Sequence, residues 1–176
     1  MQYSTPIKYG IIAGLLMIAG YVLIYLIDAA LLASLLTLSL YIILIFCMVY
    51  GGITYRKEIG GFNSFGQAFL AIFITAFLGS FLIDAFGFIM FKFIDPALVD
   101  VVKEAALEKA EAMMEKFNTP EDQIEKQLKL IKAADYTPTI KSQSIRFLSS
   151  TIVGAILSLL IAVFVRRNDR AINENG

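Results

Sequence analysis

The chain has 176 residues, of which 58% are hydrophobic and 17% are charged, and its 15 basic and 15 acidic side chains balance to a formal charge of zero. Because the basic residues do not gather into a groove with interleaved aromatic residues, we expect no nucleic-acid partner. Histidine is absent, the single cysteine (Cys47) lies in an apolar run and no catalytic motif occurs, so we expect no enzyme activity, no metal site and no cofactor.

Four long stretches of the chain carry no charged residue: 9–27, 29–55, 59–83 and 147–165. A helix of about 20 apolar residues crosses the ~30 Å hydrocarbon core of a bilayer, and each stretch meets or nearly meets that length. The first stretch exceeds the ~7–15 residues of a signal-peptide core and ends without a cleavage site, so we interpret it as a retained span. The sequence therefore predicts an all-α integral membrane protein with four transmembrane helices.

The first three spans follow one another closely, and together they form the first unit of the chain, residues 1–91. Helices are predicted over residues 7–27, 33–55 and 64–91. Only residues 28–32 remain for the first turn, which makes spans 1 and 2 a tight antiparallel hairpin. The pair Gly60 and Gly61 breaks the helix before span 3.

Each of the four prolines follows a residue that can cap a helix. The pairs are Thr5-Pro6, Asp95-Pro96, Thr119-Pro120 and Thr137-Pro138. A Thr or Asp cap followed by Pro is a helix-start signature, because the proline ring needs no N–H there and its φ is already helical. The pairs predict the starts of span 1, of two helices between spans 3 and 4, and of the helix of span 4.

The segment between spans 3 and 4, residues 92–143, is predicted to be an extramembrane αα-hairpin. Apolar positions recur at helical spacing over 96–117 and 120–134, and Pro120 requires a break between the two helices. From Lys92 to Arg146 the chain carries nine basic and ten acidic residues. Two such helices bury little core alone, so we expect them to rest on each other and on the membrane surface, another subunit or a partner. The apolar faces comprise Leu98, Val102, Ala105, Ala112, Met113, Ile124, Leu128 and Ile131.

Span 4 and a basic tail form the last unit, residues 144–176. Four spans place both chain ends and the loop after span 2 on one side, where the basic flanking residues also gather. The positive-inside rule then predicts that both ends lie in the cytoplasm, an N-in/C-in topology. The same residues are candidate contacts for anionic lipid headgroups. They are Lys8, Arg56, Lys57, Arg166, Arg167 and Arg170.

Small residues recur at four-residue steps in spans 1 and 4. Such stripes let helix backbones approach closely. They indicate either a dimer face or packing inside one four-helix bundle, and we favour the bundle because four spans must bury surface against one another. The stripes comprise Gly10, Gly14, Ser150, Gly154, Ser158 and Ala162.

Span 3 contains one acid, Asp84, and an ionisable group inside a span is a functional hypothesis by default. Asp84 is predicted near the exit side of its helix, where hydration lowers the cost of the charge. We interpret it as a polar anchor near the interface, with an ion or proton site as the alternative.

Three blocks of the sequence resemble a known family: Tyr9-Gly10 with Gly14, the segment from Tyr55 to Phe69, and Ile94-Asp95-Pro96. They are similar to the bacterial membrane family catalogued as domain of unknown function 4199, with members mostly from Bacteroidota. The resemblance extends over nearly the whole chain. It implies a four-span inner-membrane protein with an extracytoplasmic insert, and it carries no activity.

We predict a non-catalytic membrane scaffold or accessory subunit that uses the helical hairpin as a docking element. The alternative is a small oligomeric transporter or channel that uses Asp84. A transporter is expected to show several polar groups at mid-membrane and broken helices, whereas this sequence has one acid near a helix end and no proline inside a span. The expected partners are the lipid bilayer and either another membrane protein or a second copy of the chain.

Overall fold

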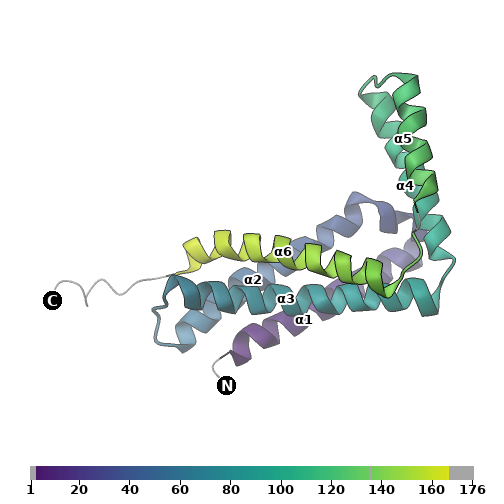
Figure 1. Ribbon diagram of the computed structural model, residues 1–176. Helices are drawn as coiled ribbons and strands as arrows, with labels where there is room; N and C mark the ends of the chain where they lie inside the picture. Colours follow the sequence, from purple (N-terminus) through teal and green to yellow (C-terminus); the bar gives the residue numbers. More distant parts are fainter. Residues whose placement is uncertain (1–2, 135, 167–176) are drawn as a thin grey trace.

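The computed structural model describes residues 3–134 and 136–166, and no strand occurs among them (Figure 1). The all-α fold class is therefore confirmed. In chain order the elements are α1 (Ser4–Ile27), η1 (Ala29–Ala33), α2 (Leu35–Glu58), α3 (Phe65–Ile89), η2 (Met90–Ile94), α4 (Leu98–Lys116), α5 (Glu121–Ala133) and α6 (Ile140–Val165).

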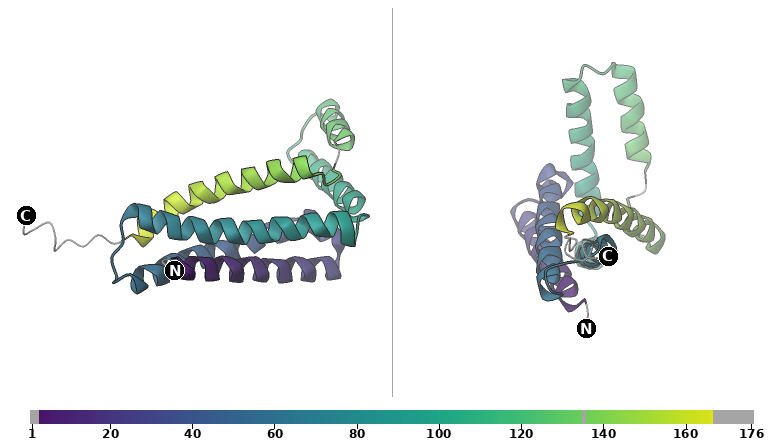
Figure 2. Two further views of the ribbon diagram at one scale, coloured as in Figure 1. Left: turned by 60° about the horizontal axis from the view of Figure 1, so that its bottom comes forward. Right: turned by 90° about the vertical axis from the view of Figure 1, so that its left-hand side faces the viewer.

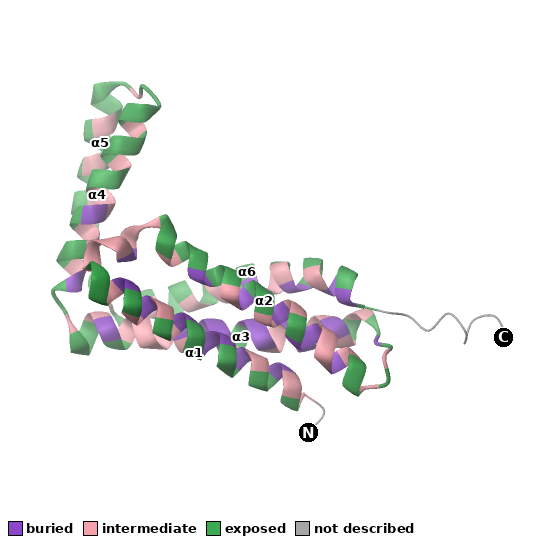
Figure 3. Ribbon diagram, turned by 180° about the vertical axis from the view of Figure 1, so that it is seen from behind, coloured by how far each residue is buried: buried purple, intermediate pink, exposed green. Residues whose placement is uncertain are grey.

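The four long apolar stretches fold into one elongated bundle of α1, α2, α3 and α6 (Figures 1 and 2). Among the described residues, four helical segments are long and apolar enough to cross a membrane: Ser4–Ile27, Leu35–Glu58, Phe65–Ile94 and Ile140–Val165. The third segment includes the π-helical turn η2, which continues α3 beyond its predicted end. The outward faces of the bundle are exposed and largely apolar (Figure 3).

Helix α3 is the centre of the bundle, because it packs against each of α1, α2 and α6. The core around it is built from apolar side chains with no exposed surface, such as Met17 of α1, Met48 of α2 and Ile72 of α3. The hydroxyl of the buried Thr75 donates to the backbone oxygens of Pro6, at 3.0 Å, and Ala71, at 3.2 Å. This interaction ties the start of α1 to α3.

The cap predicted for α1 is wrong. The helix begins at Ser4, with Tyr3 at the N-cap position, so Thr5 lies inside the first turn. The Thr5 hydroxyl donates instead to the carboxylate of Glu58, at 2.6 and 2.7 Å. The sequence pattern predicted that the Thr5 side chain caps α1, but in the structure it is held by Glu58 at the end of α2.

The cap predicted for the helix of span 4 is also displaced. Helix α6 begins at Ile140 with Thr139, not Thr137, at the N-cap position. Thr139 and Ser142 form a capping box, in which each side chain accepts a hydrogen bond from the backbone N–H of the other. The reciprocal partner three residues later explains why the helix starts after Thr139.

Helices α4 and α5 project away from the bundle and pack against each other, side by side in the right-hand view of Figure 2. The chain breaks between Lys116 and Glu121, as Pro120 predicts, and Asn118 adopts a positive φ of 52° there. Near the bundle, Leu98 and Ala105 of α4 are buried, and the base of α4 packs on η1.

The predicted apolar face of α4 is only partly used. Ala112 and Met113 are exposed, whereas Leu98 and Ala105, earlier in the same helix, are buried. The predicted face of α5, which contains Ile124, Leu128 and Ile131, is half-buried, and α5 has no fully buried residue.

Candidate functional site

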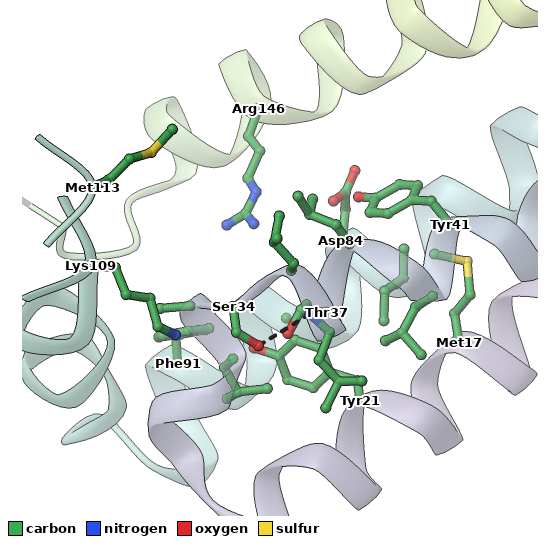
Figure 4. A pocket seen from close by; sticks show the side chains of 18 residues that line it. Met17, Tyr21, Ser34, Thr37, Tyr41, Asp84, Phe91, Lys109, Met113 and Arg146 are labelled. Carbon is green, nitrogen blue, oxygen red and sulfur yellow. Dashed lines mark hydrogen bonds between the residues drawn. The ribbon is translucent and has the colours of Figure 1, made fainter. Parts of the chain in front are cut away.

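A cavity of about 830 Å³ lies at the end of the bundle where α2 and α6 begin, beside α4 (Figure 4). Its apolar wall includes Met17 of α1, Leu40 of α2, Ile83 of α3 and Phe91 of η2. Three charged side chains also line it, and each comes from a different helix: Asp84 from α3, Lys109 from α4 and Arg146 from α6. The fold thus collects charged groups that are far apart in the sequence.

Asp84 joins α3 to α6. Its side chain is only 8% exposed, and the hydroxyl of Ser150 donates to Asp84 Oδ2 at 2.9 Å. The Gln143 amide donates to the backbone oxygen of Asp84 at 2.8 Å. Asp84 is therefore buried between two helices and hydrogen-bonded from α6. Figure 4 also shows the Tyr41 hydroxyl of α2 pointing towards the Asp84 carboxylate.

Asp84 also lines a second, smaller cavity of about 340 Å³. This cavity lies between the end of α3 and the start of α6, where Phe88, Gln143 and Phe147 form part of its wall. The Asp84 side chain thus separates two spaces on either side of the α3–α6 contact. A group in this place can bind a proton or a small cation, or it can hold the two helices together.

Arg146 and Lys109 bring two positive charges to the larger cavity. Arg146 extends from α6 into the space beside Asp84, and Lys109 reaches in from α4 (Figure 4). Within the described part of the chain, the ion pair that forms is Lys129–Glu125 on α5, so neither Arg146 nor Lys109 is paired with a carboxylate there. The cavity therefore offers positive charge to a ligand.

Sequence reasoning missed the contributions of Tyr41, Lys109, Gln143 and Arg146. A signal for the two residues of α6 exists: Gln143, Arg146 and Ser150 are spaced three and four residues apart, so they continue the small-residue stripe of α6 towards its start. Tyr41 and Lys109 carry no such local signal, because only the packing of α2 and α4 brings them to the cavity.

The two small-residue stripes lie at helix contacts within the bundle. A Cβ atom at Gly10 or Gly14 would approach Leu78 or Leu82 of α3 to 2.8 Å or less. In α6, a Cβ at Gly154 would meet Ala76 of α3 at 3.6 Å. The remaining stripe positions are buried or half-buried: Ser150, Ser158 and Ala162.

The basic residues predicted as topology signals have separate roles in the structure. The Arg56 guanidinium donates to the backbone oxygen of Val165 at 2.8 Å, which satisfies a carbonyl at the end of α6. Arg166 lies over the ring of Phe65, 5.9 Å from its centroid, and Lys57 is exposed. Arg167 and Arg170 lie outside the described residues.

The variant Asp84→Asn should lower the free energy of unfolding by less than about 1 kcal/mol, because its amide oxygen still accepts the Ser150 hydrogen bond. Ser150→Ala should cost more, about 1–3 kcal/mol, because it removes the donor from a buried carboxylate. Chemical unfolding in detergent micelles, followed by circular dichroism, compares the two variants. A larger loss in Asp84→Asn than in Ser150→Ala would show that the charge of Asp84 itself stabilises the fold.

Comparison with known proteins gives a family and no further relative. A family model described as "Protein of unknown function (DUF4199)" matches residues 8–167. No curated protein and no solved structure matches this chain.

Proposed function

We propose that this chain, which belongs to the DUF4199 family, is a four-span integral membrane protein that acts as a non-catalytic scaffold or accessory subunit. Four helices of membrane-crossing length and composition support the membrane assignment. So do the large apolar side chains that face away from the core, among them Phe164 of α6, which is 85% exposed. Hydrocarbon is the solvent that suits such a surface. We place the protein in a bacterial inner membrane with both ends in the cytoplasm.

The pair formed by α4 and α5 is the docking element in this proposal. The pair carries three strongly exposed apolar side chains: Met113 (62%) on α4, Phe117 (71%) at the turn and Leu130 (60%) on α5. Charged residues lie close to each of them in the sequence, and exposed apolar anchors set among polar residues are typical of protein contacts. We propose a second membrane protein as the partner, since both chains would then be held at the same surface. The projection of this pair beyond the bundle is the observation that carries the proposal.

A photo-crosslinking amino acid placed at Phe117 or Leu130 tests the docking element in native membranes. We expect affinity purification and mass spectrometry to recover one reproducible membrane-protein partner from both positions. The same crosslinker at Glu108, an exposed polar site on α4, should recover much less of it. Recovery of the chain alone, crosslinked to itself, would replace the proposed partner with a homo-oligomer.

A small oligomeric transporter or channel is the second candidate function. It is favoured by the position of Asp84 between two cavities. In this case the wild-type protein in proteoliposomes should show a pH-dependent ion flux that Asp84→Asn abolishes. We expect no such flux, because the Asp84 carboxylate already has a hydrogen-bond donor in Ser150 and holds α3 against α6.

A further inference from the structure

The larger cavity combines an apolar wall with positive charge at its edge. Lys109 and Arg146 are exposed and line it from two helices that are far apart in the sequence. The apolar wall that includes Met17, Leu40 and Ile83 continues from these cations into the bundle. A ligand that matches both parts has an anionic head and an apolar tail.

We propose that this cavity binds one phospholipid from the surrounding bilayer, with its phosphate between Arg146 and Lys109 and one acyl chain along the apolar wall. A phosphate accepts charge-assisted hydrogen bonds from guanidinium and ammonium groups. Basic pockets between transmembrane helices bind phosphate headgroups on the cytoplasmic side of membranes, and the same charge-assisted contacts are open to a phosphate headgroup in either leaflet. The volume of about 830 Å³ lies within the range of ~300–1,000 Å³ typical of small-molecule pockets, so we assign it one acyl chain and leave the second in the bilayer.

A lipid would enter the cavity from the side. Leu35, Leu36 and Leu38 at the start of α2 line the cavity and are also exposed at the surface of the bundle. An acyl chain can therefore pass between bilayer and cavity without crossing a charged surface. The Asp84 carboxylate also lines the cavity and accepts a hydrogen bond from Ser150, and the two cations outnumber this single negative charge.

Native mass spectrometry of the full chain, released from vesicles of phosphatidylglycerol and phosphatidylethanolamine, tests the two cations. We expect one retained phospholipid on the wild type. Arg146→Gln and Lys109→Gln should each weaken retention roughly tenfold, since each removes one charge-assisted contact. Lys141→Gln is the matched control: this exposed lysine of α6 does not line the cavity, and its loss should leave retention unchanged. Equal loss in all three variants would overturn the proposal.

A second variant tests the apolar part without altering charge. A Cβ atom at Gly87, which lines the cavity, meets no atom within 4 Å, so Gly87→Leu should fill the space without a backbone clash. Leucine is also a better helix former than glycine, and we expect wild-type helix content with at least tenfold weaker lipid retention. Gly66→Leu, at an equally open position that does not line the cavity, should retain lipid. Wild-type retention by Gly87→Leu would overturn the assignment.

Two competition experiments test which part of the phospholipid the cavity recognises. Soluble glycerol phosphate should displace the lipid only at much higher concentration, because it lacks the acyl chain. A fatty acid should bind more weakly than the phospholipid, because its carboxylate lacks the ester carbonyls and the headgroup that add further acceptor oxygens to the phosphate of a phospholipid. Tighter binding of either competitor would contradict a phospholipid site. Met113 lines the cavity and also belongs to the proposed docking element, but the two crosslinking positions, Phe117 and Leu130, do not line the cavity. Failure of the crosslinking test therefore leaves the lipid site standing, and loss of lipid retention leaves the docking element standing.

Discussion

Replacing Gly10 by leucine should push α1 away from α3 and lower the free energy of unfolding by about 2–3 kcal/mol. An added Cβ atom would lie 2.8 Å from the Cβ of Leu78, 3.0 Å from the backbone oxygen of Thr75 and 3.3 Å from its Cα. Two of these three atoms belong to the backbone of α3 and cannot rotate aside. The shift should also stretch the hydrogen bond from Thr75 to Pro6. Chemical unfolding in detergent micelles, followed by circular dichroism, measures the loss.

The control for this variant is Gly66→Leu, because a Cβ atom at Gly66 meets no atom within 4 Å. It adds the same side chain to a bundle helix and should leave the unfolding midpoint near that of the wild type. An unchanged midpoint in Gly10→Leu would show that α1 and α3 are not in close contact. A folded Gly10→Leu monomer derived from a dimeric wild type would support the dimer-face interpretation of the stripe.

The number and approximate positions of the long helices could be predicted from the sequence, because an uncharged apolar run of about 20 residues predicts a helix of membrane-crossing length. Their ends were less predictable. Span 2 was expected to end near Tyr55, but α2 continues to Glu58. The three added residues are charged, and two of them have distant partners: Glu58 accepts from Thr5, and Arg56 donates to Val165. The length of α2 therefore depends on contacts with α1 and α6, and the sequence pattern within α2 alone does not predict them.

The residues of the candidate site were even harder to predict from the sequence than the helix ends, because they come together only through contacts between helices. The sequence marked Asp84 as a lone acid and placed Ser150 in a packing stripe, and 66 positions separate them. Their hydrogen bond exists because α3 and α6 pack together, although the segment that contains α4 and α5 lies between them in the chain. The cavity likewise depends on the placement of α4 beside the starts of α2 and α6. Periodicity within one helix predicts which face is buried, but it does not predict which other helix that face meets.

Cysteine labelling should place the α4–α5 pair on the extracytoplasmic side of the membrane and the loop after α2 on the cytoplasmic side. Thr5 binds Glu58 and Arg56 binds Val165, so the start of α1, the end of α2 and the end of α6 meet at one end of the bundle. Helices α4 and α5 project from the opposite end (Figure 1). The first end carries Lys8, Arg56 and Lys57, and the positive-inside rule assigns it to the cytoplasm.

The measurement uses a membrane-impermeant maleimide on intact spheroplasts, with Cys47→Ala removing the native thiol. Glu121→Cys, at the exposed start of α5, should label nearly completely, whereas Lys57→Cys, also exposed, should label only after the membrane is opened. Both sites replace a charged surface residue, so the comparison isolates the side of the membrane. The nine basic residues from Lys92 to Arg146 oppose the rule, but ten acids accompany them, and a long segment translocates largely regardless of its charge. Protection at position 121 with labelling at position 57 would invert the topology and place the cavity and the α4–α5 pair on the cytoplasmic side.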